Sequence, residues 1–184
     1  TKTIGGKVAG AYYGYNDSTF KDAGVNGAWG YPGPVDSDFD IQIGDLYAEI
    51  SVALGESANV KILGDYFVNL GASGSAGQGY YLDPNLDPDR EDDGWLAGAE
   101  LSVGPAKFAY YYAGLSEDAA NPMLVDSDFA TGLGGVDIEA HRFKAAYKIT
   151  KHSTISILAQ FAEAMERENV GDVDLYQIDL SYKF

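Results

Sequence analysis

The last nine residues of the chain alternate between apolar and polar side chains without a break. The apolar set is Tyr176, Ile178, Leu180, Tyr182 and Phe184, and the polar set between them is Gln177, Asp179, Ser181 and Lys183. Neighbouring side chains of an extended strand point to opposite faces, so this run predicts a strand with one apolar and one polar face. Three large aromatic residues on one face are typical of a strand that has lipid on one side and water on the other.

Seven further segments show the same alternation, which predicts eight strands in all. They cover residues 7–15, 45–54, 60–70, 95–103, 107–115, 138–149 and 154–162. Most are close to the roughly 9–11 residues that a tilted strand needs to cross a bilayer. The chain has no run of about 18 apolar residues, so we expect no transmembrane helix.

The connections between these segments alternate between short and long. The short ones are 55–59, 104–106 and 150–153, and the long ones are about 16–44, 71–94, 116–137 and 163–174. Outer-membrane barrels have short periplasmic turns and longer external loops. An even number of strands then places both termini on the periplasmic side.

The fold class that these patterns predict is all-β, an antiparallel transmembrane β-barrel formed by residues 1–184 as a single domain. Such a sheet must close, because an open edge in hydrocarbon leaves backbone groups unpaired. Two closures are left open: a closed eight-stranded barrel, or the C-terminal half of a barrel of about sixteen strands. No signal peptide is visible, so we expect a mature form, a processed form or a fragment.

The charge of the chain excludes one class of partner. There are 28 acidic and 12 basic residues, which gives a formal net charge of −16. Nucleic-acid-binding proteins need a basic surface for the phosphates, so we expect no nucleic acid. The chain has no cysteine, which excludes disulfides and thiolate metal sites.

Charged residues on the polar faces of the predicted strands are candidates for lining a pore. They are Glu49, Lys61, Asp65, Glu100, Lys107, Arg142, Lys144, Lys148 and Asp179. In a wide barrel such side chains set ion preference. In a narrow barrel they pair with one another and only stabilise the fold. The bases gather on segment 138–149 and the acids on segments 45–103, so charge would be segregated across a pore.

An acidic run at residues 83–93 offers oxygen ligands for Ca²⁺ or another divalent cation. The candidate ligands are Asp83, Asp87, Asp89, Asp92 and Asp93. Their spacing is not that of a helix-loop-helix calcium site, and a solvated acidic loop is the simpler explanation of the run. We expect no other cofactor.

No arrangement of residues marks an enzyme. A hydrolase needs a nucleophile, a base and an orienting group that converge. The two histidines, His141 and His152, lie at the start of a strand and in a turn, and nothing marks a nucleophile near them. We therefore predict that the protein is not an enzyme.

Several motifs resemble the C-terminal β-barrel portion of a porin family of Gram-negative outer membranes. They are Asp45–Glu49, Gly64–Tyr66, Gly94–Gly98, Tyr110–Tyr112, Asp126–Phe129, the glycines 132, 134 and 135, His141 and Leu175–Leu180. The resemblance covers most of the chain loosely and the part from Gly94 onward better. It implies barrels that pass small solutes, and it implies that Phe184 is presented to the machinery that assembles outer-membrane barrels.

The expected function is an outer-membrane channel for passive diffusion of small hydrophilic solutes or ions, with acidic external loops that favour cations at its mouth. The alternative is a small closed barrel with a filled lumen, acting as a structural or surface-interaction protein through those loops. Expected partners are outer-membrane lipid and lipopolysaccharide, the barrel assembly machinery and small solutes. The sequence leaves the solute, the gating and the oligomeric state open, with a homo-oligomer among the alternatives.

Overall fold

The computed structural model describes residues 3–15, 41–71, 92–116, 119, 138–165 and 171–183. These ranges hold eight strands: β1 (Ile4–Tyr15), β2 (Ile41–Ala53), β3 (Ala58–Asn69), β4 (Asp93–Val103), β5 (Ala106–Leu115), β6 (Ile138–Lys148), β7 (Ser153–Ala164) and β8 (Val173–Tyr182). Each strand coincides with one of the alternating segments, and most boundaries shift by one to four residues. The predicted set of eight strands is confirmed. Phe184 lies outside the described residues.

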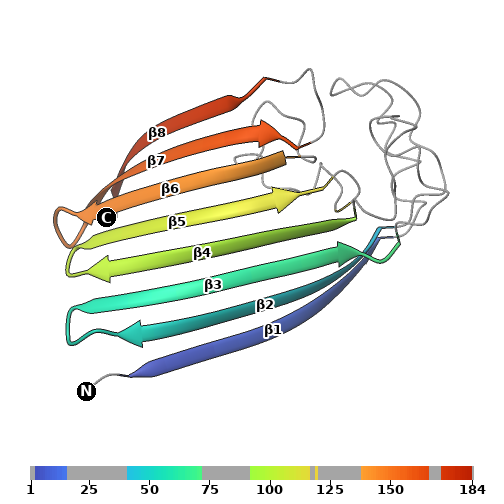
Figure 1. Ribbon diagram of the computed structural model, residues 1–184. Coiled ribbons are helices and arrows are strands. Elements are labelled where there is room, and N and C mark those ends of the chain that lie inside the picture. Colours follow the sequence, from blue (N-terminus) through green and yellow to red (C-terminus); the bar gives the residue numbers. More distant parts are fainter. Residues whose placement is uncertain are drawn as a thin grey trace.

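The eight strands form one antiparallel sheet in which each strand pairs with its neighbours in sequence, as Figure 1 shows. The three short connections lie at the same end of the strands as the start of β1 and the end of β8 (Figure 1). Two of these turns contain a glycine with positive φ, Gly55 at 99° and Gly104 at 54°. Glycine adopts this conformation without steric cost, which allows the tight reversal.

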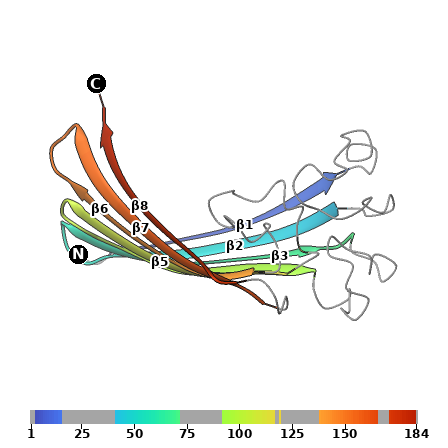
Figure 2. The same cartoon turned by 90° about the horizontal axis from the view of Figure 1, so that it is seen from above.

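The sheet has two free edges in the structure. Strands β1 and β8 stand at its two ends and are not hydrogen-bonded to each other. Figure 2 shows that the sheet is strongly bent and twisted, as right-handed strand twist requires. The structure thus shows an open all-β meander of eight antiparallel strands.

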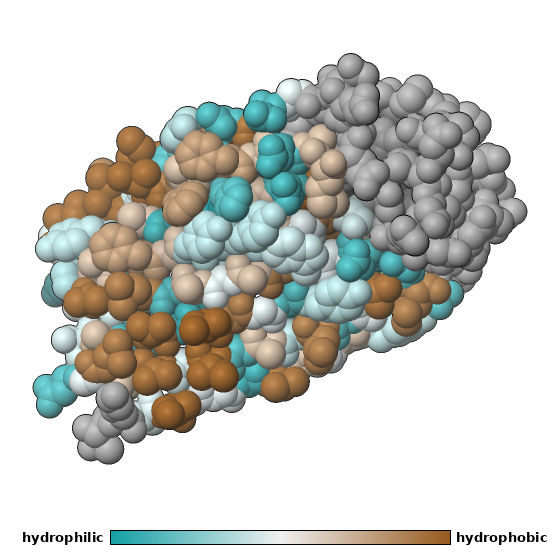
Figure 3. All heavy atoms as spheres, viewed as in Figure 1, coloured by the Kyte–Doolittle hydropathy of each residue, from teal (hydrophilic) through white to brown (hydrophobic). Residues whose placement is uncertain are grey.

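The register keeps most of the large exposed apolar side chains of the eight strands on one face. Directly paired residues share a face, and Ile50 pairs with Ile62, which in turn pairs with Ala99. The side chains of this apolar face are widely exposed, for example Ile62 at 62% and Ile178 at 73%. Figure 3 shows large apolar side chains spread over the sheet. No layer of the described structure covers this face.

Buried apolar residues are few and lie on the opposite, polar face. Among the described strands they are Ala113, Leu115, Ile138, Ala140 and Ala162, which cross-strand pairing places side by side near the ends of β5, β6 and β7 that lead into the long connections. The described part of the chain therefore buries only two large apolar side chains on its strands, Leu115 and Ile138, together with three alanines. Most of its large apolar side chains are exposed on the other face.

Three glycines, two on β4 and one on β5, make room for aromatic rings on neighbouring strands. A Cβ atom on Gly98 would lie 2.5 Å from Cδ1 of Tyr111, and one on Gly94 would lie 2.3 Å from Cζ of Phe67. Rings cannot approach a residue with a Cβ that closely, so the glycine is what lets the ring lie flat over the strand.

Replacing Gly98 with alanine should therefore destabilise the sheet by about 1–3 kcal/mol, because the Tyr111 ring must move and the surrounding packing is overfilled. The measurement is the midpoint of urea unfolding. Gly64→Ala is the matched control, since the nearest atom to its new Cβ lies 3.8 Å away. Equal costs at both glycines would contradict the proposed role of the ring contact.

Candidate functional site

The polar face of the sheet holds all nine residues that the sequence predicts as pore-lining. The cross-strand register places them on one face from β2 to β8: Glu49, Lys61, Asp65, Glu100, Lys107, Arg142, Lys144, Lys148 and Asp179. The structure thus brings these residues together on one surface. Their role in lining a pore remains a prediction.

A cluster of paired charges lies in the middle of this surface, on β2, β3 and β4. The ammonium of Lys61 is 2.7 Å from Oε1 of Glu100 and 3.9 Å from Oε2 of Glu49. These side chains are only 27–33% exposed, so water screens the pair less than on an open surface. Lys61 therefore compensates two carboxylates that would otherwise repel each other.

Two tyrosines that the sequence analysis did not single out complete this cluster. The hydroxyl of Tyr111 donates to Oε1 of Glu100 at 3.0 Å, and the hydroxyl of Tyr47 donates to Glu49. Tyr47 lies two residues before Glu49, so the alternation already placed it on the same face. Tyr111 reaches Glu100 only through the pairing of β4 with β5, which the local pattern does not contain.

The remaining acids and bases are segregated across the face. Asp45 and Asp65 each have one buried carboxylate oxygen without a hydrogen-bond partner among the described residues. On the other side, Nε of Arg142 donates to Oε1 of the buried Gln160 at 2.7 Å. Most of the nine charged residues therefore follow one division, with acids on β2–β4 and bases on β5 and β6, and Lys61 on β3 and Asp179 on β8 are the exceptions.

The predicted cation-binding loop lies mostly outside the described residues. Asp83, Asp87 and Asp89 are not described, whereas Asp92 and Asp93 are. Asp93 opens β4 and accepts a hydrogen bond from Oγ of Ser116 at 3.2 Å. Within the described ranges no group of three or more potential metal ligands occurs. The structure thus gives no geometry for a cation site, and the hypothesis stays a prediction.

Each of the two histidines lies against a tyrosine ring in the described structure. His141 lies within β6 on the apolar face, where its ring stacks on Tyr112 with centroids 4.5 Å apart, and its Nδ1 is 2.8 Å from the hydroxyl of Tyr110. His152 lies in the turn before β7, with its ring 6.2 Å from that of Tyr182. Both therefore serve as partners of tyrosines.

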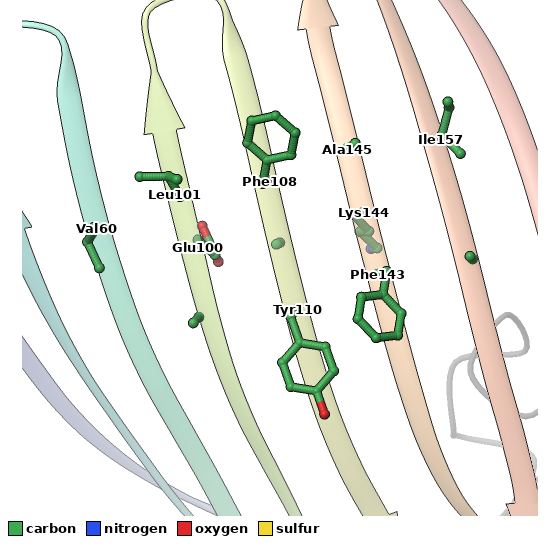
Figure 4. Close-up of a pocket in the computed structure, with 12 residues that line it drawn as sticks. Val60, Glu100, Leu101, Phe108, Tyr110, Phe143, Lys144, Ala145 and Ile157 are labelled. Atoms are coloured by element: carbon green, nitrogen blue, oxygen red, sulfur yellow. The ribbon is translucent and has the colours of Figure 1, made fainter.

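An aromatic band that the sequence analysis missed crosses the apolar face from β4 to β8. Its successive ring contacts join Trp95, Tyr112, His141, Tyr110, Phe143, Phe161 and Tyr176, with centroids 4.5–6.2 Å apart. A shallow apolar hollow of about 470 Å³ lies beside this band, and the rings of Tyr110 and Phe143 line part of it. Figure 4 shows Leu101, Phe108 and Phe143 around this hollow.

The fold and this surface define a class: an all-β protein built on one antiparallel meander, with exposed apolar side chains on one face and charges on the other. Comparison with protein-family models, with curated proteins and with solved structures found no match to this chain. The comparisons identify no family, and the porin resemblance stays a prediction. No helix in the described ranges is both long and apolar enough to cross a membrane.

Proposed function

We propose that the chain forms an outer-membrane porin-like channel for passive diffusion of small hydrophilic solutes or ions. The observation that carries this proposal is that large exposed apolar side chains lie mostly on one face of the eight-stranded sheet and charged side chains mostly on the other. Soluble monomers seldom expose contiguous apolar patches larger than a few hundred Å². A sheet with lipid on one face and water on the other needs this separation.

The length of the strands supports the same proposal. The eight strands have 10 to 13 residues, and a tilted strand crosses the hydrocarbon core with about 9–11. The location that follows is the bacterial outer membrane, with the start of β1, the end of β8 and the short turns on the periplasmic side. Lipid and lipopolysaccharide would contact the apolar face, and the assembly machinery would receive the terminal strand.

Closure is part of this proposal. In hydrocarbon the unpaired backbone groups of β1 and β8 must find partners. The two edge strands run in opposite directions, so they can pair directly to give an eight-stranded barrel. Further strands between them would give a barrel of about sixteen, whose lumen holds water.

The paired groups on the polar face favour a second candidate. Lys61 forms ion pairs with two carboxylates, and Arg142 donates a hydrogen bond to Gln160. These polar groups therefore have partners within the sheet. In a closed eight-stranded barrel such pairs would fill the lumen. The protein would then be a structural or surface-interaction protein that acts through its acidic external loops.

Recording single-channel currents in planar bilayers separates the two candidates. The full chain is refolded in detergent and added to a bilayer in potassium chloride. Discrete conductance steps support the channel and exclude the filled barrel. Folded protein that inserts without producing steps excludes the channel. Insertion is checked separately by protection of the strands from added protease.

For the channel, Lys61→Gln should raise the permeability ratio of K⁺ to Cl⁻ roughly twofold, because Glu49 and Glu100 lose their counter-charge. The ratio is obtained from the reversal potential in a salt gradient. Lys151→Gln removes the same charge from the turn between β6 and β7 and serves as the control. A ratio that changes equally in both variants would show that Lys61 does not face the conducting path.

A further inference from the structure

A second hollow lies on the polar face, beside the ion-pair cluster of β2–β4. It has a volume of about 410 Å³ and extends from β4 to β8, with Glu100 and Ser102 lining its β4 side. Small side chains form its floor, namely Ala109, Ala146 and Ser156, and cross-strand pairing places Ala146 next to Ser156. Larger polar side chains stand around this floor. The hollow therefore leaves room for a small solute on the polar face of the sheet.

Two basic side chains border one side of the hollow. Lys107 pairs with Ala146 and Lys144 pairs with Ala109, so the two lysines are diagonal neighbours on β5 and β6. Neither ammonium forms an ion pair within the described part of the chain, whereas Lys61 pairs with two acids. The ammonium of Lys144 lies 5.9 Å from the centroid of the Tyr111 ring. Glu100 also lines the hollow but is already paired with Lys61 at 2.7 Å, so the charges of the two lysines are available to an anion.

The opposite side of the hollow carries an acid. Asp179 lines it from β8, and both its carboxylate oxygens accept from Nε2 of Gln177, at 3.0 and 2.9 Å. Three strand spacings separate Lys107 from Asp179, which is roughly 14 Å. A second negative charge on a solute would therefore approach Asp179. Between the two sides, Leu158 offers an apolar surface.

We propose that this hollow binds small organic solutes with one carboxylate and a short apolar part. The carboxylate would lie between Lys107 and Lys144, and the hydrocarbon part against Leu158, which pairs with Lys144 across β6 and β7. Asp179 disfavours dianions, and the apolar wall disfavours inorganic anions. The inference deepens the proposed channel function, on which it rests, by naming the class of solute.

The test measures binding of sodium pentanoate to the full chain folded in detergent micelles, by isothermal titration calorimetry. We expect saturable binding by the unchanged chain. The Kd should rise about tenfold in the double variant Lys107→Gln/Lys144→Gln, because both charges that hold the carboxylate are lost. Lys151→Gln, which removes a charge from the nearby turn, should leave the Kd unchanged. Pentanamide, the uncharged analogue, should not bind.

A second variant tests the shape of the hollow without changing its charge. Ala146→Leu fills the floor of the hollow and should weaken pentanoate binding while both lysines stay in place. Equal binding of inorganic sulfate, or of pentanedioate, would overturn the assignment to monocarboxylates. Unchanged pentanoate binding in both the double variant and Ala146→Leu would overturn the site itself.

The outcomes for the site and for the channel can be told apart. Conductance steps without pentanoate binding support the channel and overturn the site. Pentanoate binding that both variants weaken, in a protein that gives no steps, supports the site and overturns the channel. The circular dichroism spectrum of each variant shows whether its sheet has formed.

Discussion

The variant Ile62→Lys should lower the free energy of unfolding in phospholipid vesicles by about 2–4 kcal/mol. Ile62 lies near the middle of β3, with its side chain 62% exposed on the apolar face. If lipid covers this face, a lysine there places a charge near the centre of the hydrocarbon. Urea titration, followed by the fluorescence of the two tryptophans, measures the change.

Leu54→Lys is the control for depth. Leu54 is 48% exposed and lies in the short turn that follows the end of β2. The same charge at the membrane interface costs only about 0–1 kcal/mol. If water covered the apolar face, both lysines would cost within about 0.5 kcal/mol, as exposed substitutions usually do. Small and equal costs would therefore argue against a lipid-facing surface.

The variant Asn69→Leu should destabilise the protein by about 2–4 kcal/mol, since it removes an acceptor for two backbone N–H groups. Asn69 is fully buried at the end of β3, and its Oδ1 accepts from the N–H of Gln42 at 3.0 Å and of Gly71 at 3.1 Å. Leucine is similar in size but offers no acceptor. The free energy of unfolding, from urea titration, again measures the loss.

Asn59→Leu provides the comparison at the other end of the same strand. Asn59 is exposed, so its replacement should change stability by no more than about 0.5 kcal/mol. A similar small effect at Asn69 would mean that its hydrogen bonds do not anchor the end of β3. A large effect at both positions would point instead to a general cost of leucine in this strand.

The strands were predictable because side-chain alternation is a local property of the backbone. The run from Tyr176 to Tyr182 shows its two faces in sequence alone, and β8 places them as expected. The same reasoning put Lys61 and Glu100 on one face. It did not give their 2.7 Å ion pair, because that contact depends on how β3 is aligned with β4.

The aromatic band was missed for the same reason. Trp95, His141 and Phe161 stand far apart in the sequence, and only the register of β4 to β7 brings their rings into one row. The Gly98 and Tyr111 contact is also a cross-strand contact. The acidic candidates Asp83, Asp87 and Asp89 lie outside the described residues, so their role stays a prediction.

The sequence by itself determined that the chain forms eight two-faced strands, and which side chains belong to each face, because extended backbone has a period of two residues. Only the tertiary structure decided which charges pair, which rings stack and where the hollow between Lys107 and Asp179 lies. These features depend on register, which is set by pairing between distant segments. The tertiary structure also showed that β1 and β8 are not paired with each other. No single strand could have indicated this, because it depends on the bend of the whole sheet.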